Sequence, residues 1–164
     1  MARAVRRLRP QVGAIAISAN GDPGRFAALG CPVLADALGD RRGPLAGIEA
    51  GLTHAAGTGA AGIVTVAVDT PFFPDDLVQV LRATAGPGGA AIAADADGMH
   101  PTFALWPVSA LAAVRAQIGA GAYRLRDLAA AVGAGTAMFG GRAFFNINTP
   151  EDLARAEAMA EGRG

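Results

Sequence analysis

Residues 62–69, Gly-Ile-Val-Thr-Val-Ala-Val-Asp, constrain the fold of this chain more than any other stretch. The run is apolar and rich in β-branched residues, which is typical of a parallel strand that is buried on both faces. It ends on a carboxylate, Asp69, and Thr70-Pro71 follow directly. Open α/β sheets bind their ligands beyond the carboxyl ends of such strands. Asp69 is therefore a candidate binding residue, although capping the next helix is a simpler role for it.

Strand and helix patterns alternate along the rest of the chain. Apolar runs predict strands at residues 12–18, 31–36, 62–69, 89–95, 99–107, 136–139 and 143–146. Amphipathic patterns and helix-start signals predict helices at residues 2–9, 23–30, 43–56, 74–85, 108–119, 123–133 and from 150 to about 160. This order predicts a doubly wound, Rossmann-like three-layer α/β sandwich, with mixed strands towards the end. No linker interrupts the 164 residues, so we expect residues 1–164 to form a single domain.

Three of the early predicted strands are followed by, or end on, a polar side chain, namely Asn20, Asp36 and Asp69. Because the carboxyl ends of parallel strands meet at one edge of a sheet, these three side chains are expected to converge on one crevice. Turns also favour Asn and Asp, so coincidence stays an alternative. One carboxylate without a nucleophile and base beside it suits Mg²⁺-assisted phosphoryl chemistry, since Mg²⁺ is held by one or two carboxylates plus substrate phosphates.

Arginine and histidine side chains offer further candidates for the site. Arg41 and Arg42 precede a glycine and can grip a phosphate by bidentate contacts, or they can be solvated loop residues. His54 falls within a predicted helix and is expected to be structural, whereas His100 before Pro101 is the better site candidate.

Composition excludes several classes of function. All 14 basic residues are arginine, so a Walker A loop and Schiff-base chemistry are excluded. Fourteen acidic residues balance them, which argues against a nucleic-acid partner. The single cysteine, Cys31, fits a reducing cytoplasm. No run approaches the roughly 20 apolar residues of a membrane helix, so no membrane partner is expected.

Three segments carry a family resemblance. They are residues 66–77 (VAVDTPFFPDDL), residues 43–52 (GPLAGIEAGL) and above all residues 144–158 (FFNINTPEDLARAEA). Together they resemble molybdenum cofactor guanylyltransferases, and the likeness runs from about Arg6 to the C-terminus. The resemblance implies transfer of GMP from GTP to the terminal phosphate of molybdopterin, with release of pyrophosphate. It also implies a cytoplasmic enzyme whose product passes to molybdoenzymes or to their chaperones.

The resemblance also implies roles for individual residues. Asn20 and Asp36 would contact the guanine nucleotide, and Asp69 would bind Mg²⁺ together with the nucleotide phosphates. The molybdopterin side would be lined by Asn146 and Asn148, with His100 and Arg41 as weaker candidates.

One feature of the family is missing from the sequence. Members begin with a strand and a glycine-rich loop that cradles the GTP phosphates and supplies a lysine, and this chain has neither that loop nor any lysine. The first strand would lie between the strands at 12–18 and 62–69, so its loss would leave two strands unpaired or force them to re-pair. We therefore expect an N-terminally shortened domain that binds GTP poorly and transfers GMP slowly. A version extended upstream by the missing length is expected to be faster.

Two alternatives remain open at this point. The chain could be a guanylyl- or cytidylyltransferase for another phosphorylated acceptor, such as a different pterin cofactor or phospholactate. It could also be a non-catalytic remnant that binds molybdopterin or partner proteins.

Overall fold

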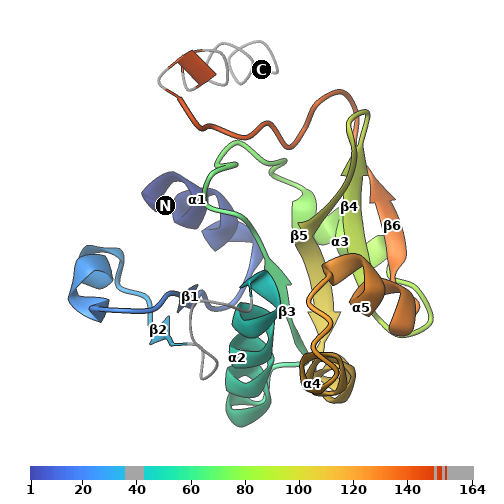
Figure 1. Cartoon of the computed structure of the whole chain (residues 1–164). Helices are drawn as coiled ribbons and strands as arrows, with labels where there is room; N and C mark the ends of the chain where they lie inside the picture. Colours follow the sequence, from blue (N-terminus) through green and yellow to red (C-terminus); the bar gives the residue numbers. More distant parts are fainter. Residues whose placement is uncertain (36–42, 150, 153, 155–164) are drawn as a thin grey trace.

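The computed structural model describes residues 1–35, 43–149, 151–152 and 154 (Figure 1). Its main sheet has four strands in the order β3-β5-β4-β6. Their bounds are Gly62–Thr65 for β3, Ala91–Asp95 for β4, Gly98–Pro107 for β5 and Gly135–Met138 for β6. Strand β5 runs antiparallel to both of its neighbours, whereas β4 and β6 are parallel. The sheet is therefore mixed, as expected for the later part of the chain.

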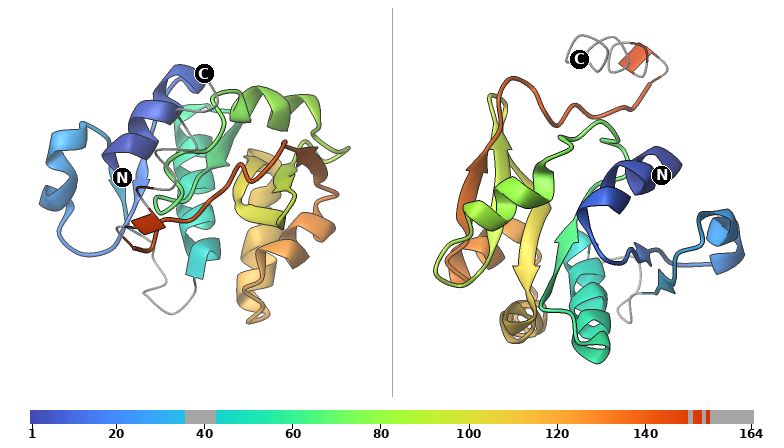
Figure 2. Two further views of the ribbon diagram at one scale, coloured as in Figure 1. Left: turned by 90° about the horizontal axis from the view of Figure 1, so that it is seen from above. Right: turned by 180° about the vertical axis from the view of Figure 1, so that it is seen from behind.

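Helices cover both faces of this sheet and give the predicted three layers (Figures 1 and 2). One face packs against α2 (Gly43–Thr58), α4 (Leu111–Gly119) and α5 (Leu125–Ala131). The other packs against α1 (Ala2–Leu8) and α3 (Leu77–Ala83). In α2 the apolar residues Leu45, Ile48 and Leu52 are all buried, which confirms the spacing read from the sequence.

A small lobe formed by residues 17–34 lies apart from the main sheet (Figure 2, the lighter blue part of the chain). It contains two parallel strands, β1 (Ile17–Ser18) and β2 (Val33–Leu34), joined by the 3₁₀ helix Pro23–Leu29. The Asp22 carboxylate accepts a hydrogen bond from the Gly24 N–H at 2.8 Å and caps that helix, as its Asp-Pro start predicted. Neither strand pairs with the four-stranded sheet.

The strand predicted at residues 62–69 is shorter than expected. Regular pairing ends at Thr65, opposite Ala104, so Asp69 lies four residues beyond the strand. The physical reason is that, in the described part of the chain, β3 has a partner on one side only. The prediction of a strand at residues 143–146 is wrong, because these residues do not pair with any described strand.

Pro101 was expected to restrict its strand to an edge or to a strand beginning. Strand β5 is an interior strand, but Pro101 lies early in it, where the pairing with β4 jumps from His100 to Ala104. It also lies outside the stretch that pairs with β3. Proline is tolerated at such an irregularity because no ladder hydrogen bond from its nitrogen is needed there.

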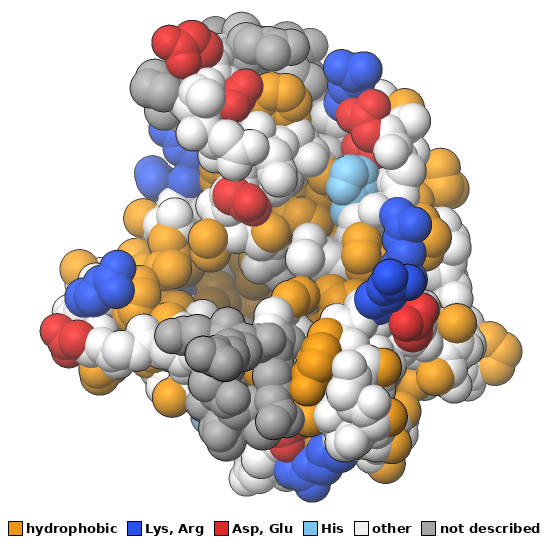
Figure 3. All heavy atoms as spheres, viewed as in Figure 1, with side chains coloured by type: hydrophobic (Ala, Val, Ile, Leu, Met, Phe, Trp, Pro, Cys, Tyr) orange, Lys and Arg blue, Asp and Glu red, His pale blue; other side chains and the backbone are white. Residues whose placement is uncertain are grey.

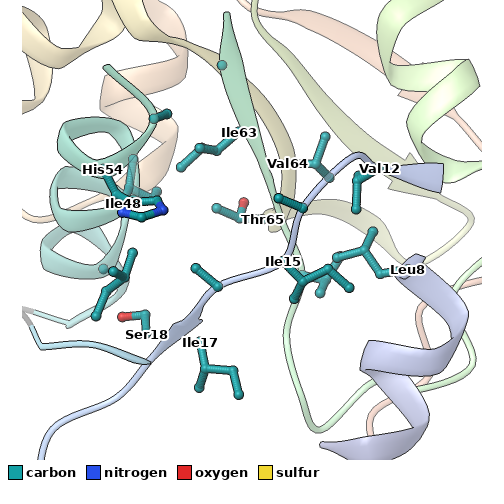
Figure 4. A pocket seen from close by; sticks show the side chains of 18 of the residues that line it. Leu8, Val12, Ile15, Ile17, Ser18, Ile48, His54, Ile63, Val64 and Thr65 are labelled. Carbon is teal, nitrogen blue, oxygen red and sulfur yellow. The ribbon is translucent and has the colours of Figure 1, made fainter. Parts of the chain in front are cut away.

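A cavity of about 1270 Å³ separates β1 from β3. Strand β1 pairs with β2 and strand β3 pairs with β5, and the two strands do not pair with each other across the cavity. The cavity is lined by residues of the N-terminal lobe, α2 and β3 (Figure 4).

Candidate active site

The loop that follows β3 is tied to a segment almost eighty residues later in the chain. The Ile147 N–H donates to the Asp69 carbonyl oxygen at 2.7 Å. The hydroxyl of Thr70, only 1% exposed, contacts Asp69 Oδ1 at 3.4 Å and Asn146 Oδ1 more closely. A hydroxyl has one hydrogen to donate, so Thr70 can donate to one of these two acceptors at a time. The result is a fixed group of three oxygen-bearing side chains from two distant segments.

A second buried side chain, Asp95, contacts the same distant segment at Phe144, which precedes Asn146. Asp95 is buried, with its side chain 1% exposed, and its Oδ2 accepts a hydrogen bond from the Phe144 N–H at 3.2 Å. Its Oδ1 lies 2.7 Å from His100 Nε2 and accepts the Asp97 N–H at 2.9 Å. The His100 ring also packs on the Phe144 ring, with centroids 4.7 Å apart. Asp95 therefore links the turn between β4 and β5 to the segment that carries Asn146.

These contacts decide the ionisation of Asp95. Burial raises the pKa of this carboxyl group, because it disfavours the charged form. The hydrogen bonds from His100, the Asp97 N–H and the Phe144 N–H act in the opposite direction, as does the charge interaction with His100. Together they outweigh burial, and the pKa of Asp95 is lowered from its ordinary value of 3.8.

The donors around Asp69 fit a substrate-borne Mg²⁺ better than a metal held by protein ligands alone. Asp69 is exposed and lines the cavity. Its carboxylate, the Thr70 hydroxyl and the Asn146 amide oxygen are hard oxygen donors of the kind that Mg²⁺ accepts. Within the described ranges no three His, Cys, Asp or Glu side chains are placed to hold a metal ion. Most ligands of an ion at Asp69 would therefore come from phosphates and water.

The candidate site residues predicted from the sequence do not all lie together in the structure. Asp69 and Asn146 are brought together through Thr70, and Asn148 follows two residues later, where its N–H donates to Asp152 Oδ2 at 3.2 Å. His100 contacts Asp95 and Phe144 instead of Asp69.

The convergence of Asn20, Asp36 and Asp69 stays a prediction. Ser18, at the end of β1, lines the cavity together with Asp69, but half-buried Asn20 is not part of its wall. Asp36 and Arg41 lie outside the described residues.

Sequence reasoning missed two residues of this site. Asp95 ends an apolar run, Ala-Ile-Ala-Ala-Asp, in the same way that Asp69 ends its own run, and this parallel was the available signal. Thr70 follows Asp69 directly in the sequence and carries no such signal. Its burial and its bridging position depend on the fold, so no local pattern marks them.

The described helices include none that is both long enough and apolar enough to cross a membrane.

Comparison with known proteins identifies the family of this chain. Residues 1–135 match the family model of the MobA-like NTP transferase domain. A protein of Cereibacter sphaeroides (strain ATCC 17029 / ATH 2.4.9) named molybdenum cofactor guanylyltransferase is 50% identical over 93% of this chain and 78% of its own length. One of the same name from Mesorhizobium japonicum is 45% identical over 94% of this chain and 79% of its own.

Solved structures show the same fold at low sequence identity. A putative protein from Aquifex aeolicus VF5 superposes with a TM-score of 0.77, at 20% identity, over 90% of this chain and 78% of its own. Molybdopterin-guanine dinucleotide biosynthesis protein A from Archaeoglobus fulgidus gives 0.62, at 21% identity, over 97% and 86%. The family match over residues 1–135 and the 50% identity to a relative assign this chain to the molybdenum cofactor guanylyltransferases, a family of nucleotidyltransferases.

Proposed function

We propose that this chain transfers GMP from GTP to the terminal phosphate of molybdopterin and releases pyrophosphate. Its membership of the guanylyltransferase family supports the reaction class. The observation that carries the proposal is the link between the Asp69 loop and the Asn146 segment, made through Thr70 and the Ile147 N–H. The Asp69 carboxylate thus lies near the Asn146 side chain, which supports a site where one substrate binds on each side.

Bond making and breaking need little from the protein beyond position and charge. An oxygen of the molybdopterin phosphate attacks the α-phosphorus of GTP, and the bond between that phosphorus and the oxygen bridging to the β-phosphate breaks. Pyrophosphate leaves with the electron pair of that bond. A phosphate monoester is largely ionised near pH 7, so no general base is needed to activate the acceptor. Mg²⁺, when bound, would offset the triphosphate charge and the charge that develops on the leaving pyrophosphate.

Each part of the site has a defined task in this scheme. The Asp69 carboxylate would hold the ion against the nucleotide phosphates, while its own backbone is fixed by the Ile147 N–H. Asn20 and Asp36 are proposed to contact the guanine nucleotide. Asn146 and Asn148 are proposed for the molybdopterin side, with His100 and Arg41 as weaker candidates. Because positioning supplies most of the rate in phosphoryl transfer, the rigidity of the Asp69 loop is itself part of the proposed mechanism.

Replacement of Asp69 tests the proposal at the residue that carries it. Asp69→Asn keeps the size of the side chain but removes its charge, and we expect kcat for GMP transfer to fall about 100-fold, the usual scale for one electrostatic group. The measurement is the rate of pyrophosphate release with GTP, Mg²⁺ and molybdopterin.

Asp76→Asn is the matched control, because Asp76 is an exposed carboxylate of the same loop whose side chain makes no capping hydrogen bond. It is expected to keep the parent rate and the parent midpoint of unfolding. Equal rates for the Asp69→Asn and Asp76→Asn proteins would refute the role of Asp69.

A further inference from the structure

The segment that follows β6 crosses the end of the sheet from the β4–β5 turn to the Asp69 loop (Figures 1 and 2). We call residues 141–147 the crossing segment. One end of it is bound at the turn, where the Gly141 carbonyl oxygen accepts a backbone hydrogen bond of 3.2 Å. The other end is bound at the loop, where the Ile147 N–H donates to the Asp69 carbonyl oxygen at 2.7 Å. The chain between these two attachments carries Asn146, a residue proposed for the molybdopterin side.

Between the two attachments, Asp95 holds the crossing segment at Phe144. The Phe144 N–H donates to Asp95 Oδ2 at 3.2 Å, and both residues are buried. The Phe144 ring packs on the rings of His100 and Phe103, with centroids 4.7 Å apart in each case. Asn146 lies two residues beyond Phe144, and two residues of chain span at most about 7 Å. Little slack separates them, so a displacement of Phe144 moves Asn146 as well.

An ionic contact at the same turn is exposed to solvent. Arg142 Nε lies 3.2 Å from Asp97 Oδ1, and the two side chains are 61% and 50% exposed. Figure 3 shows acidic and basic side chains side by side over this turn. Solvent screens such a pair, so it contributes little to holding the segment. The buried Asp95 contact therefore holds the crossing segment more firmly than the ion pair does.

Asp95 itself is closed off from any substrate. Its side chain is 1% exposed, and its oxygens accept the N–H groups of Phe144 and Asp97, with His100 Nε2 at 2.7 Å as the third partner. A charge buried in this way is costly, and an apolar side chain of similar size often stabilises a core equally well or better. An apolar side chain does not, however, hold three hydrogen-bond donors in fixed directions. These are the properties of a group that positions other residues.

We propose that Asp95 is a positioning residue for the acceptor side of the reaction, which holds Phe144, and through it Asn146, in place for molybdopterin. The inference rests on the proposed function. The nucleotide side depends on Asp69, which belongs to a different loop that α1 also packs against. Loss of the Asp95 charge is therefore expected to weaken the use of molybdopterin more than the use of GTP.

Steady-state kinetics of Asp95→Asn test this division between the substrates. The variant keeps the size of the side chain but replaces one accepting oxygen with an NH₂ donor, so the three donors are no longer all paired. We expect kcat/KM for molybdopterin to fall on the order of tenfold while KM for GTP stays within about twofold of the parent's, because a small misplacement of one binding group has effects of this size.

Two variants serve as controls and are expected to keep the parent's kinetic constants. Asp97→Asn removes the exposed carboxylate of the same turn. Gln11→Ala removes a hydrogen bond to the N-terminal turn of α3 and controls for a general loss of stability. An equal loss of kcat/KM for molybdopterin in Asp95→Asn and in either control would overturn the proposal, as would an Asp95→Asn protein that uses GTP and molybdopterin equally badly.

Amide hydrogen exchange reports on the crossing segment without any reaction. In Asp95→Asn we expect the Ile147 N–H to exchange on the order of tenfold faster than in Asp97→Asn, because the segment opens locally more often. Equal exchange in the two variants would overturn the proposal. A parent chain that transfers no GMP would instead refute the proposed function, and the exchange at Ile147 would still decide whether Asp95 positions the segment.

The parent chain decides the question should Asp95→Asn fail to fold. Release of Phe144 from Asp95 is expected to release Ile147 as well. The opening free energy measured by exchange at Ile147 is therefore expected to be no larger than that at Phe144. A larger value at Ile147 would contradict the proposal, because Ile147 would then stay in place without Phe144.

Discussion

At the scale of single residues, Asp69 and Asp95 share a sequence pattern but differ in surroundings. Both end apolar runs, yet Asp69 is exposed beside the cavity while Asp95 is buried among three hydrogen-bond donors. An exposed carboxylate can meet a metal ion and phosphates, whereas a buried, fully partnered one stabilises the fold. The same chemical group therefore serves binding in one place and positioning in the other.

The lowered pKa of Asp95 predicts the pH dependence of stability. A carboxyl group whose pKa is lowered by folding contributes stability that is fully present above its ordinary pKa, 3.8 for Asp95, and that is lost as pH falls through the folded value. We expect the free energy of unfolding of the parent to decrease more steeply below about pH 4 than that of Asp95→Asn. At pH 7 the variant is expected to be less stable by about 1–3 kcal/mol, because hydrogen bonds to a buried charge are lost.

Urea unfolding at several pH values measures this difference. Asp76→Asn is again the control, and its pH profile is expected to follow the parent's. Parallel profiles for the parent and Asp95→Asn would show that Asp95 contributes nothing to the acid sensitivity.

At the scale of elements, α1 packs against residues 72–75, the second half of the loop that carries Asp69. Arg7 forms an ion pair with Asp75 at 3.1 Å and also contacts the Phe73 carbonyl oxygen, and Arg3 stacks over the Phe72 ring at 4.8 Å. The Asp75 side chain is 76% exposed, so the ion pair is screened by solvent and contributes little by itself. The packing of α1 on this segment therefore depends more on the buried contacts made near its C-terminal end.

Gln11 makes the contact that we expect to matter most for this packing. Its Oε1 accepts the N–H of Val78 at 3.0 Å, and Val78 lies in the first turn of α3, where N–H groups have no partner within the helix. Gln11→Ala is expected to lower the free energy of unfolding by about 1–2 kcal/mol, because this buried N–H is left unpaired.

Urea denaturation of a matched pair of variants checks this prediction. Gln79→Ala removes an exposed glutamine of the same helix and is expected to change stability by less than about 0.5 kcal/mol. Equal losses in the two variants would mean that Gln11 does not cap α3.

The spacing of apolar residues predicted a helix or strand best where one face of that element is buried in the core. The helix at residues 43–58 and the paired helices at 111–119 and 125–131 follow from apolar spacing and turn signals. The early end of β3 could not be predicted, because it depends on a partner strand and not on the residues of β3. Residues 143–146 have the apolar pattern of a strand, but that pattern does not show whether a partner strand is present. The Phe144 N–H donates to the Asp95 carboxylate and not to a neighbouring strand.

The site was predictable only in part, for a similar reason. Asp69 and Asn146 stood out by their places in the sequence, but their meeting through Thr70 depends on tertiary contacts. The burial of Asp95 depends on the packing of Phe144 and His100 around it.

At the scale of the whole molecule, the structure consists of a large core and a small lobe. A three-layer core holds the Asp69 loop, α1 and the Asn146 segment, while the lobe with β1 and β2 lies across the cavity. The core is packed on both faces of its sheet, and the opening lies at the β3 edge. Substrate binding at Asp69, which lines the cavity, would therefore take place at this edge of the molecule.

Transfer of label from nucleotide to acceptor tests the central claim most directly. The purified chain is incubated with molybdopterin, Mg²⁺ and GTP labelled at its α-phosphate, and the products are separated. We predict label in a molybdopterin guanine dinucleotide, none when Mg²⁺ is withheld, and none when labelled CTP replaces GTP. Label that stays in GTP, or that transfers equally from CTP, would contradict the assignment.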